Sequence, residues 1–454
     1  MKRIHKIALV SITPPSEIDN APENPHDKWP GYGIRRIQAD ILRAYPGDDI
    51  DLIIYEYPAD NIEPLLAELE EFSPDLIGGS AYIWSFELLV DVAQHYKQYR
   101  PDGLVVFGGP SARTCMMELE PYQKAGDYID ALCTGEGEGV INEILSSGAT
   151  TKEEITGIAG LAIAKDDKWI NTAPRSLLID LDVVASPYQM DLMPHNQWGY
   201  LESYRGCPMS CSFCEWGVSG PNNRIFSRDY IATEMRAMLD ANVFPGIFQL
   251  DAGLNLNAKG FKEFAAAAEE TEFFRQKMLF AHVYPSKLKE EHMTFLRSCS
   301  TPVIGLGLQA FDQKVLKSHS RPAKIEHFNR VAHELAEIGV VEVQILFALP
   351  GDTPDGFMRA LDFAMALPAQ VRVFHTLVLP DALMTRALPE FDIKFDPYSL
   401  KVESCQGWSS ADIERVSREL DDLADDDAGG VTNLWWSLNS NRTRSLVRNE
   451  FQLS

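Results

Sequence analysis

Three cysteines, Cys207, Cys211 and Cys214, lie within eight residues and are separated by three and then by two residues. Three thiolates can bind three irons of a cubane iron–sulfur cluster and leave the fourth iron open. An open iron can bind a substrate or a cofactor, whereas a cluster held by four cysteines mainly carries electrons. The spacing therefore predicts a cluster with one reactive iron, and it raises the question of what binds that iron.

A zinc site is the main competitor for such a cysteine group. Zinc needs a fourth ligand, and neither a second CxxC nor an HxxxH pattern lies near the three cysteines. The chain has 7 cysteines, an odd number that argues against a disulfide framework in a long chain. The other four lie in apolar or helical contexts, where we expect small buried hydrophobic side chains: Cys115, Cys133, Cys299 and Cys405.

Length and composition limit the class of protein. The chain has 454 residues, enough for two or three domains, and its 45% hydrophobic and 24% charged residues are ordinary for a globular protein. The formal net charge is 41 − 66 = −25, and an acidic surface repels nucleic acid. No apolar run is long enough for a membrane span, and the first ten residues do not resemble a signal peptide. We expect a cytoplasmic protein that binds neither nucleic acid nor membrane.

The first third of the chain alternates short apolar segments with amphipathic ones. The expected strands are Lys6–Ile12, Asp51–Tyr57, Asp75–Ser80, Leu104–Gly109 and Tyr128–Cys133. The expected helices are Ile34–Ala44, Ile62–Phe72, Phe86–Gln98, Ala112–Gln123 and Gly139–Leu145. Strands joined by single helices predict right-handed crossovers and a parallel, doubly wound sheet. We therefore expect a Rossmann-like α/β domain over residues 1–148, with its ligand at the carboxyl ends of the strands.

Glycine-rich turns follow three of these strands. They are Gly78-Gly79-Ser80, Gly108-Gly109-Pro110-Ser111 and Gly135-Glu136-Gly137-Glu138. Glycine allows a ligand to approach the backbone closely, although tight turns of any such domain also use it. None of the turns is a GxGxxG fingerprint, so a dinucleotide is not indicated. Three such turns in consecutive units favour a ligand site.

The rest of the chain divides into three parts. Residues 149–197 are expected to form a linker with a β-hairpin around a charged turn, 198–380 a partial barrel, and 381–454 a C-terminal extension with one helix. The expected barrel strands are Tyr200–Tyr204, Gly246–Asp251, Lys277–His282, Pro302–Leu306, Val341–Phe347 and Val371–Thr376. Six βα units are fewer than the eight of a closed barrel, and the cysteine loop follows the first strand, where active sites of such barrels lie.

From about residue 200 to residue 400 the chain resembles the radical S-adenosylmethionine (SAM) enzymes. Phe213, just before the third cysteine, matches that family. The resemblance extends to a branch with methylthiotransferases and oxygen-independent coproporphyrinogen oxidases, through four segments: Gly305-Leu306-Gly307-Leu308-Gln309, Arg321, Phe347-Ala348-Leu349-Pro350-Gly351-Asp352-Thr353 and Val378-Leu379-Pro380. The chain departs from the branch where its PGT motif reads Pro380-Asp381-Ala382.

The resemblance implies that the amino and carboxylate groups of SAM chelate the open iron of a 4Fe-4S cluster held by the three cysteines. Reduction of the cluster then cleaves SAM to a 5′-deoxyadenosyl radical. The residues implied in SAM binding are Phe213, Asp251, Gln309, Arg321 and Gln344. Asp251 is equally compatible with a helix N-cap or Asx turn, and Gln344 with an ordinary buried amide. No residue is assigned a catalytic role.

A Rossmann-like domain ahead of such a barrel resembles the cobalamin-binding subfamily of radical SAM enzymes. The residues implied in cobalamin binding are Ser80, Tyr82, Trp84, Gly108, Gly109, Pro110, Gly135, Glu136 and Glu138. Tyr82 and Trp84 are as compatible with core aromatics as with a corrin contact. The DxHxxG motif that ligates cobalt from below is missing, and the nearest histidine, His26, has a different context. Trp216, Tyr188 and His375 are further candidates on the substrate side.

These features predict a cobalamin-dependent radical SAM methyltransferase that acts on an unactivated carbon of a small molecule or peptide. An external donor such as flavodoxin or ferredoxin would reduce the cluster. The alternatives are rearrangement, cyclisation or aminocarboxypropyl transfer with the same cofactors, and a non-catalytic electron-transfer protein. RNA methylthiolation is disfavoured, because the N-terminal domain has no second set of three cysteines and no basic C-terminal module follows.

Overall fold

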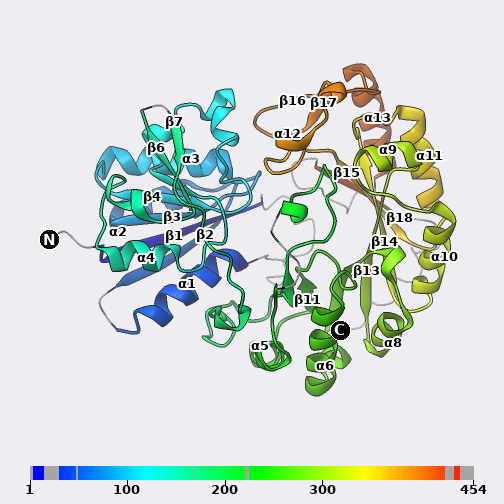
Figure 1. Ribbon diagram of the computed structural model, residues 1–454, viewed down its shortest axis with the longest axis horizontal. Helices are drawn as coiled ribbons and strands as arrows, with labels where there is room; N and C mark the ends of the chain where they lie inside the picture. Colours follow the sequence, from blue (N-terminus) through cyan, green and yellow to red (C-terminus); the bar gives the residue numbers. More distant parts are fainter. Residues whose placement is uncertain are drawn as a thin grey trace. The chain divides into compact units, whose positions relative to one another are not determined.

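The computed structural model describes residues 4–14, 30–47, 50–166, 168–218, 220, 224–424 and 434–439. The chain forms two compact units, one built mainly from Lys28–His195 and the other mainly from Asn196–Asp396 with Leu400–Ser454. Each unit contains one large sheet of seven strands (Figure 1). The domain boundaries drawn from the sequence stay a prediction.

A parallel sheet organises the N-terminal unit. Its strands are β1 (Lys6–Thr13), β2 (Asp51–Pro58), β3 (Leu76–Ser80), β4 (Leu104–Gly108) and β5 (Ala131–Cys133), in the order β2-β1-β3-β4-β5. Its helices are α1 (Tyr32–Ala44), α2 (Glu63–Phe72), α3 (Phe86–Tyr99) and α4 (Val140–Ser147). The four pairings among β1 to β5 are all parallel. The Rossmann-like fold is therefore confirmed.

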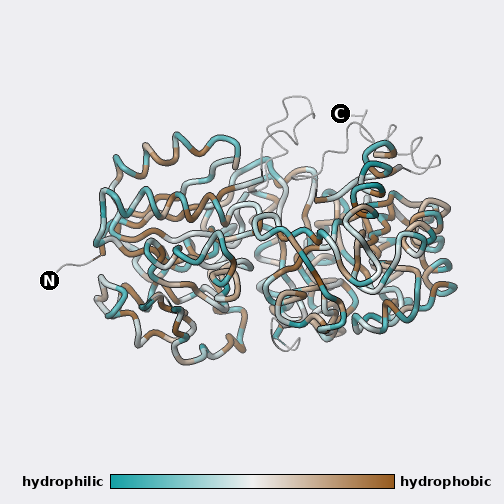
Figure 2. Tube along the Cα trace, turned by 90° about the horizontal axis from the view of Figure 1, so that it is seen from above, coloured by the Kyte–Doolittle hydropathy of each residue, from teal (hydrophilic) through white to brown (hydrophobic). Residues whose placement is uncertain are grey.

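Burial explains why these strands were visible in the sequence. The middle of β1 is buried on both faces, and β3 and β4 are buried nearly throughout. A parallel sheet covered on both faces needs continuous apolar strands rather than alternating ones. The helices are amphipathic, so their apolar stripes cover the sheet. Figure 2 shows the result, with hydrophobic colour along the inner segments and hydrophilic colour on many outer turns.

The helix expected at Ala112–Gln123 is wrong. The segment forms short 3₁₀ turns at Met116–Glu118 and Glu120–Tyr122, and a third follows at Ala125–Asp127. Leu119 between the first two turns is extended, with φ −69° and ψ 140°. Pro121 lacks the N–H that a continuous helix would use, and in such a helix its ring would clash with the carbonyl group four residues earlier. The spacing of the apolar residues gave no sign of this break.

A hairpin of β6 (Leu161–Lys165) and β7 (Lys168–Asn171) extends the N-terminal sheet. Strand β6 pairs antiparallel with β5, and β7 pairs antiparallel with β6. The hairpin expected in the segment 149–197 thus lies at the edge of this sheet.

The second unit is built around six parallel strands, as the sequence predicted. They are β8 (Gly199–Leu201), β11 (Gly246–Gln249), β12 (Met278–Val283), β13 (Pro302–Gln309), β14 (Val340–Phe347) and β15 (Gln370–His375), neighbours in that order. The helices beside them are α5 (Arg228–Asp240), α6 (Ala258–Thr271), α7 (Phe273–Gln276), α8 (Glu290–Ser298), α9 (Gln313–Ser318), α10 (Ile325–Ala336) and α11 (Pro354–Met365). The partial-barrel fold is confirmed.

The C-terminal part of the chain adds to this unit. After β15 come α12 (Leu383–Arg386), the antiparallel pair β16 (Lys394–Phe395) and β17 (Val402–Ser404), and α13 (Ser410–Leu423). The last described strand, β18 (Trp435–Asn439), pairs antiparallel with β15. The extension is therefore partly built into the barrel sheet. Among the helices of the described residues, none is both long enough and apolar enough to cross a membrane.

Candidate iron–sulfur and cofactor site

The cysteine loop begins where a short two-stranded ribbon ends. Strand β9 (Tyr204–Arg205) pairs antiparallel with β10 (Arg224–Ile225), so the residues before and after the loop are joined. Gly206 follows β9 with φ +97°, a conformation that side chains other than glycine rarely adopt. Gly206 therefore turns the chain out of the ribbon and into the cysteine loop.

All three cysteines line one cavity of about 320 Å³. The remainder of the wall comes mainly from the carboxyl ends of β11 to β14 and includes Asp251, His282, Gln309, Arg321 and Gln344. Burial raises the pKa of the Cys207 thiol, and it raises the pKa of the Cys214 thiol to about 11. The cavity thus combines three thiols with polar groups from several strands.

In the described part of the chain, three or more His, Cys, Asp or Glu side chains do not gather as they would around a single metal ion. A cubane cluster does not need such a group, because each cysteine binds a different iron and the thiols surround a volume rather than meet at a point. Three thiols on the wall of one cavity fit a 4Fe-4S cluster with one open iron.

His319, the residue directly after α9, holds the cysteine loop through its backbone carbonyl group and its ring. The backbone N–H of Ser212 donates to the carbonyl oxygen of His319 at 3.2 Å, and the Ser212 hydroxyl lies 2.7 Å from His319 Nδ1. His319 Nε2 lies 2.8 Å from the carbonyl oxygen of Pro350 and must donate to it. Burial lowers the pKa of His319, so the ring is neutral and Nδ1 accepts from Ser212.

Phe213 is not on the cavity wall. Its ring lies 5.8 Å from the ring of His319, and it packs against a small apolar cluster that includes Leu316 and Leu349. The structure therefore gives Phe213 contacts that anchor the cysteine loop, and its role toward SAM stays a prediction.

Asp251 lies beneath the start of the cysteine loop, and hydrogen bonds engage both of its oxygens. One oxygen accepts from the backbone N–H groups of Ser203 at 2.8 Å and Tyr204 at 3.3 Å. The other accepts from Gln249 Nε2 at 2.6 Å and from the Ser203 hydroxyl. Burial raises the pKa of Asp251 to about 7, against the effect of these donors. This geometry favours a role in positioning the loop over a direct bond to the SAM amine.

Gln309 and Arg321 meet beside the cysteines. Gln309 has φ +68° at an irregularity in the pairing of β13 with β14. One guanidinium nitrogen of Arg321 donates to the carbonyl oxygen of Gly307 at 3.0 Å, and another lies 3.9 Å from Cys211 Sγ. The guanidinium also lies over the Tyr284 ring, 4.6 Å from its centroid. Arg321 therefore places a positive charge next to the thiols.

Gln344 belongs to a polar chain inside the barrel. Its Nε2 donates to Glu342 Oε1 at 2.8 Å and lies 3.0 Å from His282 Nε2. Because a carboxylate only accepts, the amide nitrogen must face Glu342, and it then donates its second hydrogen to His282. Burial lowers the pKa of His282, which agrees with a neutral accepting ring. Glu342 is also paired with Arg372 at 2.8 Å.

His282 and Glu342 were missed by sequence reasoning. Both lie on strands with otherwise apolar neighbours, and Glu342 shares one face of β14 with Gln344 because side chains alternate along a strand. Two polar residues at that spacing in a buried strand were the available signal. In the structure they fix the amide of Gln344 in one orientation.

In the N-terminal unit, the turns after β3 and β4 lie side by side. The N–H of Ala81 donates to the carbonyl oxygen of Gly108 at 2.7 Å, and the N–H of Ser111 donates to that of Ala81 at 3.1 Å. Gly109 has φ +103°, and a Cβ there would lie 2.7 Å from the Ala81 oxygen. Ser80 is paired in register with Gly108. The structure therefore brings these predicted residues together.

An unpartnered hydroxyl supports a ligand at these turns. Ser111 is 1% exposed, and its hydroxyl has no hydrogen-bond partner among the described residues. Pro110 beside it is exposed, and so is Gly135 after β5, where an added Cβ would meet nothing within 4 Å. A buried hydroxyl and open glycine backbone at the strand ends fit a bound cobalamin.

The aromatic and acidic members of the predicted set have structural contacts. The rings of Tyr82 and Trp84 stack at 4.6 Å, and Trp84 Nε1 donates to the carbonyl oxygen of Ile12 at 3.1 Å. Glu136 accepts from the N–H of Leu178 at 3.4 Å. Glu138 is half-buried in the same turn. Their role toward cobalamin stays a prediction, and His26 lies outside the described residues.

The three substrate-side candidates are placed differently. Trp216 lines the cysteine cavity and is 43% exposed. His375 is buried with Nε2 at 2.9 Å from the carbonyl oxygen of Val402, and burial lowers its pKa to about 4. Tyr188 is buried against the ring of Tyr32 at 6.2 Å. Of the three, Trp216 alone lines that cavity.

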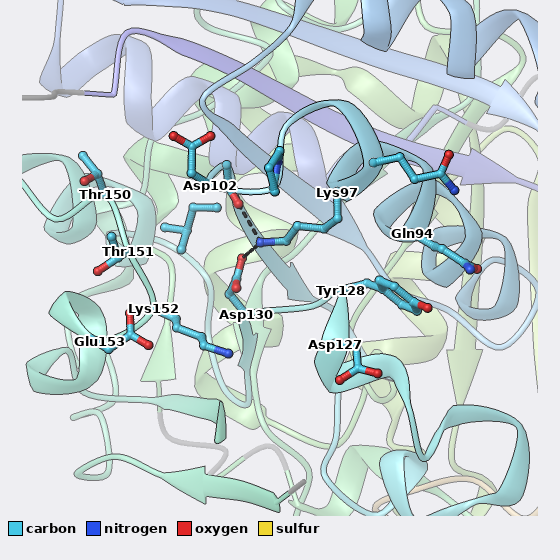
Figure 3. Close-up of a pocket in the computed structure, with 14 residues that line it drawn as sticks. Gln94, Lys97, Asp102, Asp127, Tyr128, Asp130, Thr150, Thr151, Lys152 and Glu153 are labelled. Carbon is cyan, nitrogen blue, oxygen red and sulfur yellow. Dashed lines mark hydrogen bonds and ion pairs between the residues drawn. The ribbon is translucent and has the colours of Figure 1, made fainter. Parts of the chain in front are cut away.

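A larger cavity of about 590 Å³ lies in the N-terminal unit (Figure 3). It is at the amino end of β4, whereas the glycine turns follow the carboxyl ends. Lys97 points into it and bonds to Asp130 at 2.7 Å and to the carbonyl oxygen of Gly103 at 2.7 Å. Asp130 also accepts from the N–H of Val105 at 2.8 Å. These contacts join α3 to the strand starts, and we assign the cavity a structural role.

Comparison with known proteins identifies both units. The family model described as "B12 binding domain" matches residues 27–145, and the model described as "Radical SAM superfamily" matches residues 201–364. The fold is also that of a solved structure, the radical SAM methyltransferase TsrM from Kitasatospora setae with tryptophan substrate and a SAM analogue bound. The TM-score is 0.66 at 15% identity, over 93% of this chain and 90% of that chain.

Two curated relatives are methyltransferases by name. The cobalamin-dependent radical SAM methyltransferase TokK of Streptomyces tokunonensis is 24% identical over 82% of this chain and 56% of its own length. The 2-(S-pantetheinyl)-carbapenam-3-carboxylate methyltransferase of Streptantibioticus cattleyicolor is 23% identical over 76% of this chain and 53% of its own length. The chain thus spans about half the length of these relatives.

The fold and site define a two-domain protein with a B12-binding domain and a radical SAM domain. The chain belongs to the radical SAM enzyme family that carries a cobalamin-binding domain. The radical SAM domain implies a 4Fe-4S cluster and SAM, and the B12-binding domain implies cobalamin.

Proposed function

We propose that the protein is a cobalamin-dependent radical SAM methyltransferase that acts on an unactivated carbon of a small molecule or peptide. The observation that carries the proposal is the set of three cysteines on one cavity wall, in a chain that also has a B12-binding domain. When bound, the cluster and SAM supply a 5′-deoxyadenosyl radical for hydrogen abstraction, and cobalamin supplies the methyl group.

The residues of this chain would hold and orient these groups. Cys207, Cys211 and Cys214 would bind three irons. Gln344, with its amide nitrogen held by Glu342, has its carbonyl oxygen left to accept from a SAM hydroxyl or amine. The cavity of about 320 Å³ that these residues line would also limit the access of water to a reactive radical.

The charge of the chain and the names of the relatives support the proposed substrate class. The acidic chain, with a net charge of −25, is unsuited to nucleic acid. The name of the second relative describes a small carbapenam carboxylate as its substrate. These points support a small molecule or peptide here. An external electron donor such as flavodoxin or ferredoxin would reduce the cluster.

Anaerobic reconstitution tests the proposal. Protein supplied with iron, sulfide and hydroxocobalamin is desalted and assayed for iron, sulfide and corrin absorbance. We expect all three to be retained, and dithionite with SAM to yield 5′-deoxyadenosine. The matched control is the triple variant Cys207→Ala, Cys211→Ala, Cys214→Ala. It should lose iron and SAM cleavage but keep the corrin, because the B12-binding domain match lies in the other unit.

The products of SAM distinguish the alternatives. With a substrate, methylation gives S-adenosylhomocysteine together with 5′-deoxyadenosine, whereas aminocarboxypropyl transfer gives methylthioadenosine. Protein that holds iron and sulfide but no corrin would refute a cobalamin-dependent reaction. A cluster spectrum unchanged by SAM, with no SAM cleavage, would indicate an electron-transfer protein instead.

A further inference from the structure

Arg386 connects the C-terminal extension to the cysteine loop. It is the last residue of α12, and its Nη2 donates to the carbonyl oxygens of Cys211, at 3.1 Å, and of Cys214. Its Nε donates to the carbonyl oxygen of Asp381 at 2.8 Å, which fixes the guanidinium relative to α12. One side chain thus spans the backbone of two of the three predicted iron ligands.

A second bond joins the same two segments. The N–H of Asp381 donates to Glu215 Oε1 at 3.3 Å, and Glu215 directly follows the third cysteine. Segment 381–386 therefore holds the end of the cysteine loop at two points. On the other side, His319 bonds to Ser212 in the middle of the loop. The loop is thus held on both sides by residues more than 100 positions away in sequence.

Charge adds to this geometry. A guanidinium is always protonated in proteins, and Arg386 is half-buried, where water screens a charge less than at the surface. Reduction of a 4Fe-4S cluster adds one electron and makes the cluster more negative. A fixed positive charge beside the loop therefore favours the reduced state, since cluster potentials depend on net charge, hydrogen bonds and exposure.

We propose that Arg386 is a positioning residue for the cluster, which holds the carbonyls of Cys211 and Cys214 and raises the reduction potential through its charge. The inference rests on the proposed function, because it requires a 4Fe-4S cluster on the three cysteines. It also gives the C-terminal extension a role, since α12 follows the barrel strands.

The test is a redox titration of reconstituted protein, followed by electron paramagnetic resonance of the reduced cluster. The one-electron reductant is dithionite with mediator dyes. Arg386→Gln removes the charge, Arg386→Lys keeps the charge but loses the guanidinium geometry, and Arg418→Gln on α13 removes an equal charge from an exposed site. Iron and sulfide are measured on every sample, so that potentials refer to loaded protein.

We expect Arg386→Gln to lower the equilibrium constant for reduction about tenfold. For a one-electron couple this is a fall of about 59 mV in the midpoint potential. Arg386→Lys should stay nearer the wild-type potential, and Arg418→Gln should match it. A merely structural role would lower the iron content and leave the potential of the loaded fraction unchanged.

Loaded Arg386→Gln with the wild-type midpoint would overturn the inference. If Arg386→Gln does not fold, Arg386→Met takes its place, because methionine also removes the charge. A lowered midpoint in its loaded fraction supports the inference, and a wild-type midpoint overturns it. Wild-type protein that binds no cluster would refute the proposed function itself. A loaded wild type beside an unchanged variant refutes the role of Arg386 alone.

Discussion

Asp251 offers the sharpest test of how the barrel holds the cysteine loop. Two variants, Asp251→Ala and Asp251→Asn, both lack the ionisable group, but asparagine keeps one acceptor oxygen. That oxygen can still accept hydrogen bonds from the backbone N–H groups of Ser203 and Tyr204. Their nitrogens lie 2.8 and 3.3 Å from the native carboxylate oxygen. Gln249 can turn its amide toward the new Asn nitrogen, because its oxygen has no partner among the described residues.

The difference between the variants follows from the unpaired donors. Leaving one buried N–H without an acceptor costs about 1–3 kcal/mol, so two such groups in Asp251→Ala cost about 2–6 kcal/mol relative to Asp251→Asn. Urea unfolding of the metal-free protein measures this difference, and hydrogen–deuterium exchange across residues 199–206 locates it. Asp422→Ala, at an exposed position on α13, serves as the control and should stay within about 0.5 kcal/mol of wild type.

Equal midpoints and equal exchange for the two variants would refute the assigned hydrogen bonds. The pair also decides between the two roles of Asp251. If Asp251→Asn folds as well as wild type but no longer binds SAM, the carboxylate contacts SAM after all. If it binds SAM normally, the residue acts through the loop.

The same residue predicts a pH dependence of stability. The pKa of Asp251 is raised from 3.8 to about 7 by burial, so the folded state binds the proton more tightly than the unfolded state. Its contribution to stability is complete below pH 4 and is lost as the pH rises to about 7, by about 4 kcal/mol. Over this window Asp251→Asn should gain stability relative to wild type. A constant difference in the free energy of unfolding would contradict the raised pKa.

Two glycines give further predictions, with Gly157→Ala as their control because a Cβ there meets nothing within 4 Å. Gly109→Ala should cost about 1–3 kcal/mol, because its φ of +103° and the Ala81 oxygen 2.7 Å from the new Cβ both oppose a side chain. Its corrin retention should fall, and wild-type retention would contradict the placement of cobalamin at this turn. Gly305→Ala would put Cβ 2.5 Å from His282 Cδ2 and should cost about 1–3 kcal/mol. Calorimetric SAM binding should weaken at least tenfold, and unchanged affinity would show that His282 does not support the cavity.

The sequence predicted the parallel strands well because of what a covered sheet requires. Strands buried on both faces are continuous apolar runs, and turns with glycine or proline separate them from amphipathic helices. The sequence did not predict short elements such as α12, because its four residues are too few to show a helical period. Strand β18 pairs with β15 from far along the chain, so local pattern alone gave no register for it.

The site shows the same limit at the level of side chains. The cysteines were found because their ligand role depends on spacing within one loop. Arg386, His319 and Glu342 were not, because each acts through a partner that only the fold brings near. Asp251 was found for its place after a strand, yet which donors a buried carboxylate receives is decided by the neighbouring strand.

These contacts imply that the barrel organises the cysteine loop before any iron binds. Asp251 holds its start, His319 its middle and Arg386 its end, through hydrogen bonds that involve protein groups alone. A loop that is already ordered loses less conformational entropy when its ligand binds, so affinity for the cluster increases. The fixed loop would also hold a bound cluster at one place relative to Gln344 and Arg321. Radical chemistry depends on such placement, because misoriented groups would let the radical react with protein or solvent.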